Sequence, residues 1–288
     1  MSTTTTSPAV TVRDLHKHYG AKRAVDGLDL TVERGEIFAV LGPNGAGKST
    51  TVEILEGYRR RDRGEVSVLG VDPARADRRW RSRIGIVLQT TDDRPELTVA
   101  EQVHHAATFY PAPRDPDAVI DAVGLGDKAR TRTRALSGGM RRRLDVALGI
   151  VGDPELLFLD EPTTGFDPEA RRAFWELIRG LRESGTTILL TTHYLDEADA
   201  LADRCAVVSD GRVVALGTPS ELGGRDADTA TVRWVEDGVN RSERTATPTA
   251  VVAALTARLG GEIPALQVLR PTLEETYLAL VSPKEDVR

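Results

Sequence analysis

The chain has 288 residues, 40% of them hydrophobic and 28% charged, an ordinary globular composition with room for one large domain and an appendage. The formal net charge of -6 argues against a nucleic-acid partner, because proteins that bind nucleic acid usually present basic surfaces. No run approaches the roughly 20 apolar residues that span a bilayer. The single cysteine, Cys205, excludes an internal disulfide and a cysteine metal cluster, and its apolar neighbours predict a core residue.

The N-terminal part of the chain predicts a disordered lead followed by an antiparallel β layer. Residues 1–9 are rich in serine and threonine and lack the basic and apolar regions of a signal peptide. Residues 10–15 and 27–32 alternate between polar and apolar side chains, as half-buried strands do, with turn residues at 20–23. Tyr19 could offer a ring on which adenine stacks, although an exposed turn tyrosine is the commoner role of such a residue.

A glycine-rich loop then matches the phosphate-loop pattern G-x-x-x-x-G-K-[ST] at every fixed position, between an apolar strand at 37–41 and a helix-compatible run at 49–56. In such a loop, backbone N–H groups and the start of the helix bind the phosphates of a nucleoside triphosphate. The lysine adds a mobile positive charge, and the serine hydroxyl is a ligand for Mg²⁺. The predicted nucleotide-binding residues are Gly42, Pro43, Asn44, Gly45, Ala46, Gly47, Lys48, Ser49 and Thr50.

Two further strands follow the phosphate-loop helix, at 65–70 and 84–88. The second is fully apolar and ends at Gln89. A buried parallel strand brings the residue after its carboxyl end to the ligand crevice, so Gln89 could reach a bound metal or water. A lone glutamine at a strand end is, however, more often a simple turn residue.

From residue 90 to residue 153 the pattern is mainly helical. Thr98 and Glu101 have the spacing of a capping box at a helix start. His104 and His105 are adjacent, so they point to different faces of their helix and do not form the i, i+4 pair that metals prefer. We expect both histidines on the surface.

A second candidate anion site lies at a later helix start. A serine N-cap is followed by two glycines, which destabilise a first helical turn unless something must approach the backbone closely. Exposed N–H groups at such a start bind anions. The arginines at 141–143 could simply form a solvated face of this helix. The residues of this candidate site are Leu136, Ser137, Gly138, Gly139 and Met140.

Two later strands end in chemically active side chains. The apolar strand at 156–159 leads into Asp160, which could hold Mg²⁺ through water, and Glu161, which could orient or deprotonate an attacking water. The strand at 186–190 ends near His193, which could contact the γ-phosphate or hold Glu161 and water in place. An isolated histidine, by contrast, is usually structural.

Over residues 10–222, these motifs resemble the nucleotide-binding subunit of ATP-binding cassette (ABC) transporters, and the segment 136–140 carries the resemblance most specifically. The resemblance implies a P-loop NTPase of ABC type that hydrolyses ATP with Mg²⁺. It also implies that two such domains sandwich two ATP molecules, with the signature segment of each capping the γ-phosphate held by the other.

The same resemblance implies roles for single residues. The catalytic residues are Lys48, Glu161 and His193, with Tyr19 stacking on adenine, Gln89 in the Q-loop, Asp167 in the D-loop, and Ser49, Gln89 and Asp160 as Mg²⁺ ligands. At Met140 the family most often has glutamine, so we expect altered nucleotide contact without loss of hydrolysis.

Longer segments narrow the resemblance to the daunorubicin-resistance-like, ABC-2-type exporters of bacteria. These segments are 137–144, 192–199 and, near the C-terminus, 271–278. The implied partners are ABC-2-type transmembrane permease subunits and a second nucleotide-binding subunit, in a homodimer on ATP binding. The implied location is the cytoplasmic side of the membrane, with membrane contact through the permease only, and the implied cargo is a drug, an antibiotic or a lipid-like molecule.

We therefore expect an α/β fold with a mainly parallel core sheet, an N-terminal antiparallel β layer, a helical subdomain at about 90–153 and a small C-terminal extension. The expected divisions are a lead at 1–9, an ABC nucleotide-binding domain at 10–224 and an accessory extension at 225–288. The sequence of the extension predicts a strand at 231–235, a helix near 249–259 and a closing helix from residue 272.

Two other functions remain open from the sequence. The first is a soluble ABC-type ATPase switch acting on ribosomes or DNA, although such proteins usually have two cassettes or a long coiled-coil insertion, and this chain has neither. The second is a small-molecule kinase, which would leave the signature segment and His193 without a role.

Overall fold

The computed structural model describes residues 7–88, 95–222, 230–269, 273–274 and 277–278. The chain forms two compact units, Met1–Leu216 and Gly217–Arg288. The boundary predicted between residues 224 and 225 falls outside the described residues, so that division stays a prediction. None of the helices in the described ranges is long and apolar enough to cross a membrane.

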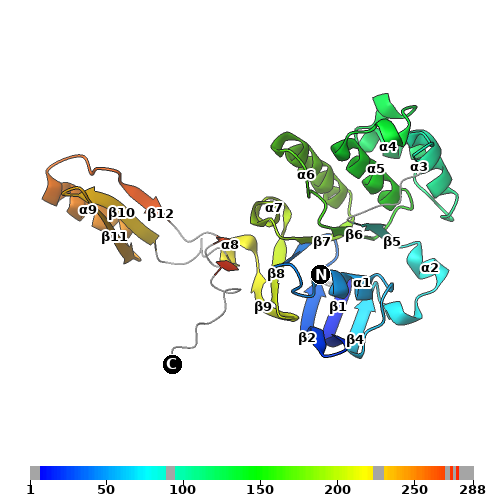
Figure 1. Ribbon diagram of the computed structural model, residues 1–288, viewed down its shortest axis with the longest axis horizontal. Helices are drawn as coiled ribbons and strands as arrows, with labels where there is room; N and C mark the ends of the chain where they lie inside the picture. The colour runs from blue at the N-terminus through cyan, green and yellow to red at the C-terminus, as the bar shows by residue number, and fades with distance from the viewer. Residues whose placement is uncertain (1–6, 89–94, 223–229, 270–272, 275–276, 279–288) are drawn as a thin grey trace, which may run out of the picture. The chain divides into compact units, whose positions relative to one another are not determined.

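The centre of the first unit is a six-stranded sheet with the strand order β5-β6-β7-β3-β8-β9 (Figure 1). The ladders that join β5, β6, β7, β3 and β8 are all parallel. These strands are mostly buried, and β3 and β6 are almost wholly apolar, as strands covered on both faces must be. Their bounds are β3 Ile37–Leu41, β5 Ile84–Val87, β6 Leu156–Asp160, β7 Thr187–Thr192, β8 Arg204–Ser209 and β9 Arg212–Gly217.

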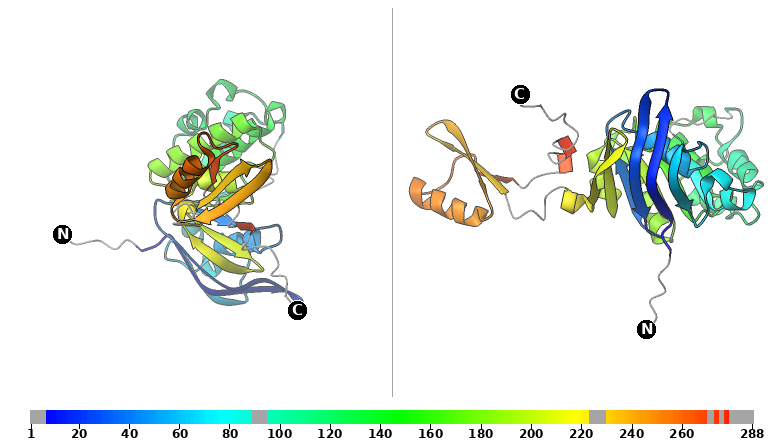
Figure 2. Two further views of the ribbon diagram at one scale, coloured as in Figure 1. Left: turned by 90° about the vertical axis from the view of Figure 1, so that its left-hand side faces the viewer. Right: turned by 90° about the horizontal axis from the view of Figure 1, so that it is seen from below.

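A separate antiparallel sheet forms a second layer of this unit, in the order β2-β1-β4 (Figure 2). Its strands are β1 Val10–Tyr19, β2 Lys22–Val32 and β4 Arg63–Val68. The predicted strands at 10–15 and 27–32 are parts of longer ones, because register irregularities after Val12 let β1 bend and continue to Tyr19. The turn is therefore shorter than predicted.

The main core lies between the two sheets around the helix α1, Lys48–Leu55. One buried cluster includes Val12 from β1, Leu55 from α1, Phe38 from β3 and Phe158 from β6. Successive residues of a strand face opposite sides of its sheet, so the neighbours of Phe158 in β6 face the helices on the other side. The phosphate-loop helix is thus enclosed between two layers.

The remaining helices of the first unit cover the core sheet or extend from it. They are α2 Arg78–Arg81, α3 Val99–Ala107, α4 Pro116–Ala122, α5 Gly138–Ile150, α6 Pro168–Glu183 and α7 Leu195–Leu201, with short 3-10 turns at Pro73–Arg75, Gly126–Lys128 and Thr133–Ala135. The helices α3, α4 and α5 pack on one another, in agreement with the predicted helical region.

The predicted capping box starts α3. The Thr98 hydroxyl accepts from Glu101 N at 3.2 Å, and Glu101 Oε2 accepts from Thr98 N at 2.8 Å. His104 and His105 are exposed, as predicted. His104 Nε2 lies 3.0 Å from an oxygen of Asp117.

The second unit contains the antiparallel sheet β11-β10-β12 and the helices α8, Pro219–Leu222, and α9, Pro248–Leu259. Its strands are β10 Ala230–Glu236, β11 Val239–Thr245 and β12 Gln267–Leu269. Val232, Trp234 and Leu255 join one buried cluster between the sheet and α9. The predicted strand and long helix are confirmed, while the closing helix predicted from residue 272 lies partly outside the described residues.

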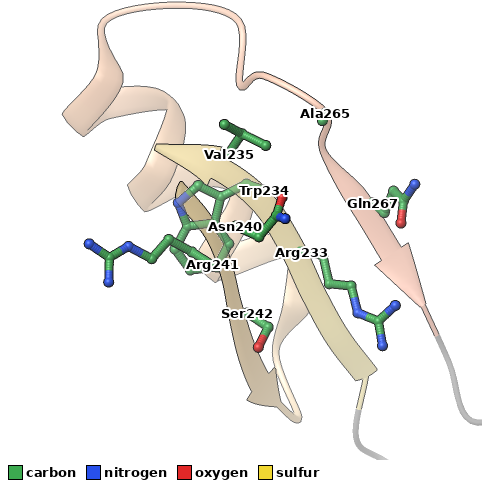
Figure 3. A pocket seen from close by; sticks show the side chains of 8 residues that line it. All are labelled: Arg233, Trp234, Val235, Asn240, Arg241, Ser242, Ala265 and Gln267. Carbon is green, nitrogen blue, oxygen red and sulfur yellow. The ribbon is translucent and has the colours of Figure 1, made fainter. Parts of the chain in front are cut away.

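The opposite face of this small sheet is polar. Arg233 stands in register with Ser242 on β11 and Gln267 on β12. These side chains and Asn240 line a hollow of about 420 Å³ (Figure 3). The strand β11 was not predicted, because its seven residues are polar or charged except Val239 and lack the expected alternation.

Candidate nucleotide-binding site

The phosphate loop connects the fully buried β3 to α1 and has room only for glycine at two positions. A Cβ atom on Gly42 would lie 2.4 Å from the carbonyl oxygen of Val208, and one on Gly47 would lie 2.2 Å from that of Ala24. Gly47 also has a φ of 105°, which L side chains rarely adopt. Among the described residues, no acceptor takes the backbone N–H of Gly45 or Gly47. These free donors suit an anion.

Lys48 is almost completely buried, with 4% of its surface exposed. Its Nζ donates to the carbonyl oxygens of Gly42 at 2.8 Å and Pro43 at 3.3 Å, and lies 3.8 Å from Glu161 Oε1. Burial lowers the pKa of Lys48, while the carboxylates of Glu161 and Asp160 oppose that shift. The loop's own carbonyl groups therefore hold the cation beside the carboxylates at the end of β6.

Asp160 and Glu161 stand where β6 ends, next to Thr191 of β7. The Thr191 hydroxyl donates to Asp160 Oδ1. The backbone N–H of Glu161 donates to both the carbonyl and the hydroxyl oxygen of Thr191, at 3.1 Å each. Glu161 has a φ of 45°, in the left-handed region that non-glycine residues seldom occupy. Such strain is common at functional sites, and here the neighbouring strand maintains it.

His193 follows β7 and lies beside the same carboxylate. Its Nδ1 is 3.3 Å from Glu161 Oε1, within ion-pair distance but without hydrogen-bond geometry. The imidazole packs on Tyr194, with ring centroids 4.1 Å apart. Arg171 of α6 covers the Tyr194 ring at 4.8 Å and pairs with Asp196 at 2.9 Å. The loop after β7 is thus held by α6.

The side chains near the loop fit a hard cation such as Mg²⁺. Ser49 presents an exposed hydroxyl at the start of α1, and Asp160 presents a carboxylate at the end of β6. The described residues include no cluster of three or more His, Cys, Asp or Glu able to hold a metal by themselves. A Mg²⁺ ion bound here would share its ligands with nucleotide phosphates, as is usual for this ion. Gln89, the other predicted ligand, lies outside the described residues.

The predicted second anion site starts α5. The Ser137 hydroxyl accepts from Met140 N at 3.3 Å and caps the helix. A Cβ atom on Gly138 would meet nothing within 4 Å, so this turn is open to solvent. A Cβ atom on Gly139 would lie 3.6 Å from that of Ala170, near the start of α6. Figure 1 shows α1, which follows the phosphate loop, and α5 on opposite sides of the core sheet.

Two other predicted residues lie at the margins of the site. Asp167 is the N-cap of α6, where its side chain accepts from Ala170 N at 2.8 Å. Tyr19 ends β1 and is 40% exposed, with Arg59 5.2 Å and Lys17 5.7 Å from its ring centroid. Their proposed roles stay predictions.

Arg142 is the residue that the sequence analysis missed. Among the three arginines read as a possible solvated face, Arg142 is buried, with 7% of its surface exposed. It donates to three backbone carbonyl oxygens, those of Leu88, Asp160 and Pro162. Arg142 thus joins the end of β5, at Leu88, to the end of β6, where its two other acceptors belong to the residues before and after Glu161. The one signal in the sequence is Asp145 at i+3, whose carboxylate lies 3.8 Å away on the same helix face.

Comparisons with known proteins agree with this geometry. The model of the ABC transporter family matches residues 25–164. A daunorubicin resistance ATP-binding protein, DrrA3 of Streptomyces coeruleorubidus, is 47% identical over 220 residues, covering 74% of this chain and 69% of the relative. A Nod factor export ATP-binding protein I of Ralstonia nicotianae is 42% identical, covering 75% of this chain and 69% of the relative. Among solved structures, cbiO1 of Clostridium perfringens, described as part of the ABC transporter complex cbiONQ, has a TM-score of 0.71 and 28% identity, covering 77% of this chain and 92% of that one.

Proposed function

Because the chain belongs to the ATP-binding subunits of ABC transporters and is an ATPase of that family, we propose that it powers a bacterial exporter of a drug, an antibiotic or a lipid-like molecule. The observation that carries the mechanism is the convergence of three side chains. Glu161 Oε1 lies 3.8 Å from Lys48 Nζ and 3.3 Å from His193 Nδ1.

In the proposed reaction, Glu161 accepts a proton from the water that attacks the γ-phosphate of ATP. Lys48 stabilises the negative charge that spreads over the phosphate oxygens during transfer. His193 holds the carboxylate and the water in line. A bound Mg²⁺, held by Ser49 and Asp160, would neutralise phosphate charge. The free N–H groups of Gly45 and Gly47 support the placement of the phosphates on the loop.

Two copies of the chain, in this proposal, close around two ATP molecules. The open helix start at Gly138 supports this arrangement, since its backbone is free to approach a phosphate and its own phosphate loop lies across the sheet. Ser137 of one copy would then face the nucleotide of the other. ABC-2-type permease subunits would bind the pair at the cytoplasmic face of the membrane.

The catalytic assignment is tested by Glu161→Gln, with Lys48→Ala for comparison. Because the amide cannot accept the proton, we expect Glu161→Gln to lower the rate of ATP hydrolysis at least about 100-fold while ATP still binds. The trapped ATP should then favour the closed dimer, which size-exclusion chromatography would detect. Lys48→Ala should weaken ATP binding itself. Wild-type turnover in the Glu161→Gln protein would remove Glu161 from this role.

The transport assignment is tested by purifying the tagged full-length protein from membranes solubilised in mild detergent. We expect a polytopic membrane protein to accompany it in near-equal amount. Recovery with ribosomes or DNA, and without a membrane protein, would support the soluble switch instead and would leave the ATPase chemistry intact.

A further inference from the structure

The short helix α2 carries an unusual surface because one buried tryptophan sets the direction of its neighbours. Trp80 is 2% exposed, and its Nε1 donates to the carbonyl oxygen of Val68 at 2.8 Å. Asp77 caps the helix by accepting from Trp80 N at 2.7 Å. Successive helical side chains differ by about 100° in direction, so a tryptophan held in the core turns Arg78 and Arg79 to the solvent, and both are exposed.

These two arginines are unpaired within the part of the chain that the structure describes. Within the described ranges, neither Arg78 nor Arg79 forms an ion pair or a side-chain hydrogen bond. Arg83, four residues after Arg79, is by contrast neutralised by Glu155, whose Oε1 lies 2.5 Å from Arg83 Nε. Two adjacent free guanidinium groups in a chain of net charge -6 form a local positive site on an otherwise acidic protein.

An exposed aromatic side chain lies beside the arginines. Arg78 and Arg79 share a hollow of about 470 Å³ with Phe109 and Pro111, which follow the end of α3. Phe109 is 58% exposed, although His105 packs on one edge of its ring, with centroids 5.1 Å apart. Both α2 and α3 lie beyond the β5 edge of the core sheet (Figure 1).

We propose that this α2–α3 surface, defined by Arg78, Arg79 and Phe109, binds directly to the phosphate headgroups of anionic membrane lipids. A planar guanidinium matches the oxygens of a phosphate with two parallel hydrogen bonds. Basic residues are attracted to the negative surface of a membrane, and an aromatic ring beside them enters the boundary between headgroups and acyl chains. The surface offers both chemistries side by side.

A lipid surface fits these residues better than an acidic protein segment. A purely acidic segment would neutralise the arginines but would offer no apolar contact to the Phe109 ring. A membrane interface takes up the cations and the ring together, because it is polar on one side and apolar on the other. The inference goes beyond the proposed function, since the chain alone would bind lipid, and it departs from the expectation of membrane contact through the permease only.

The test is flotation of the purified full-length protein with lipid vesicles, without any permease. Vesicles of phosphatidylcholine alone are compared with vesicles in which about 30% of the lipid is phosphatidylglycerol, whose headgroup is anionic. We expect binding to the anionic vesicles that weakens as salt rises. Arg78→Gln with Arg79→Gln should lower that binding about 30-fold, or about fivefold for each arginine. Phe109→Ser should weaken binding at every salt concentration.

The matched control is Arg13→Gln with Arg172→Gln, which removes two exposed arginines from β1 and α6 and changes the net charge equally. We expect this control to float like the wild type, and all variants to keep the wild-type melting temperature. The proposal would be overturned if the Arg78 and Arg79 double variant floated with anionic vesicles as well as the wild type does. It would also be overturned if the control variant lost as much vesicle binding as the double variant. It would also be overturned if the double variant bound vesicles normally but no longer copurified with the permease, since the partner would then be a protein segment.

Discussion

Replacing Arg142 with methionine tests the structural role of the one buried arginine in α5. The substitution keeps an apolar stem of similar length and removes the guanidinium. Three carbonyl oxygens then lose their donor, those of Leu88, Asp160 and Pro162. Asp145, 3.8 Å from the guanidinium, also loses the nearby charge.

The size of the effect follows from two opposing terms. A hydrogen bond from a charged donor contributes about 1.5–3 kcal/mol, so three lost bonds would cost on the order of 5–9 kcal/mol. Burial of the cation, which lowers the pKa of Arg142, is itself unfavourable and is relieved in the variant. We therefore expect a net loss of about 3–5 kcal/mol, the usual result of removing one member of a buried charged group. For a unit of this size, that corresponds to a melting temperature lower by about 10 °C.

Thermal unfolding followed by circular dichroism measures this effect, and ATP turnover gives a second readout. The variant should also hydrolyse ATP more slowly at temperatures where it stays folded, because two of the three carbonyl groups flank Glu161. The control is Arg143→Met, the next residue, whose guanidinium donates to the carbonyl oxygen of Val123 at 3.1 Å. If the two variants differ by less than about 1 kcal/mol, the three-carbonyl bridge does not stabilise the fold as argued.

Two further substitutions test the phosphate loop and a buried acid. Gly47→Ala puts a methyl group 2.2 Å from the Ala24 carbonyl oxygen at a φ of 105°, so nucleotide affinity and melting temperature should both fall. Gly20→Ala is the control, since it has a φ of 59° and nothing within 4 Å, and should cost only about 1 kcal/mol. Burial raises the pKa of Glu56 to about 8, so the folded state holds a proton that the unfolded state releases above its ordinary pKa. Wild-type stability should therefore fall from pH 5 to pH 8, and Glu56→Gln should flatten that fall in urea unfolding curves measured across the range.

The fold was predictable from local patterns where each element has its own signal. The apolar strands before the phosphate loop and before Asp160 are continuous, because strands buried on both faces need no polar residues. The capping box at Thr98 was equally local, since its two hydrogen bonds join residues three apart. The strand β11 had no such signal, because its partner β10, and not its own side chains, makes it a strand.

The sequence by itself determined the family, the phosphate loop and the kinds of side chain that follow the strands, because these depend on contiguous residues. Only the tertiary structure decided which of those side chains meet. Parallel pairing of β3, β6 and β7 brings Lys48 and His193 each within 4 Å of the Glu161 carboxylate. It also made Arg142, for which a solvated helix face was one open interpretation, a buried bridge, because its three acceptors are backbone groups from distant segments that no sequence pattern marks.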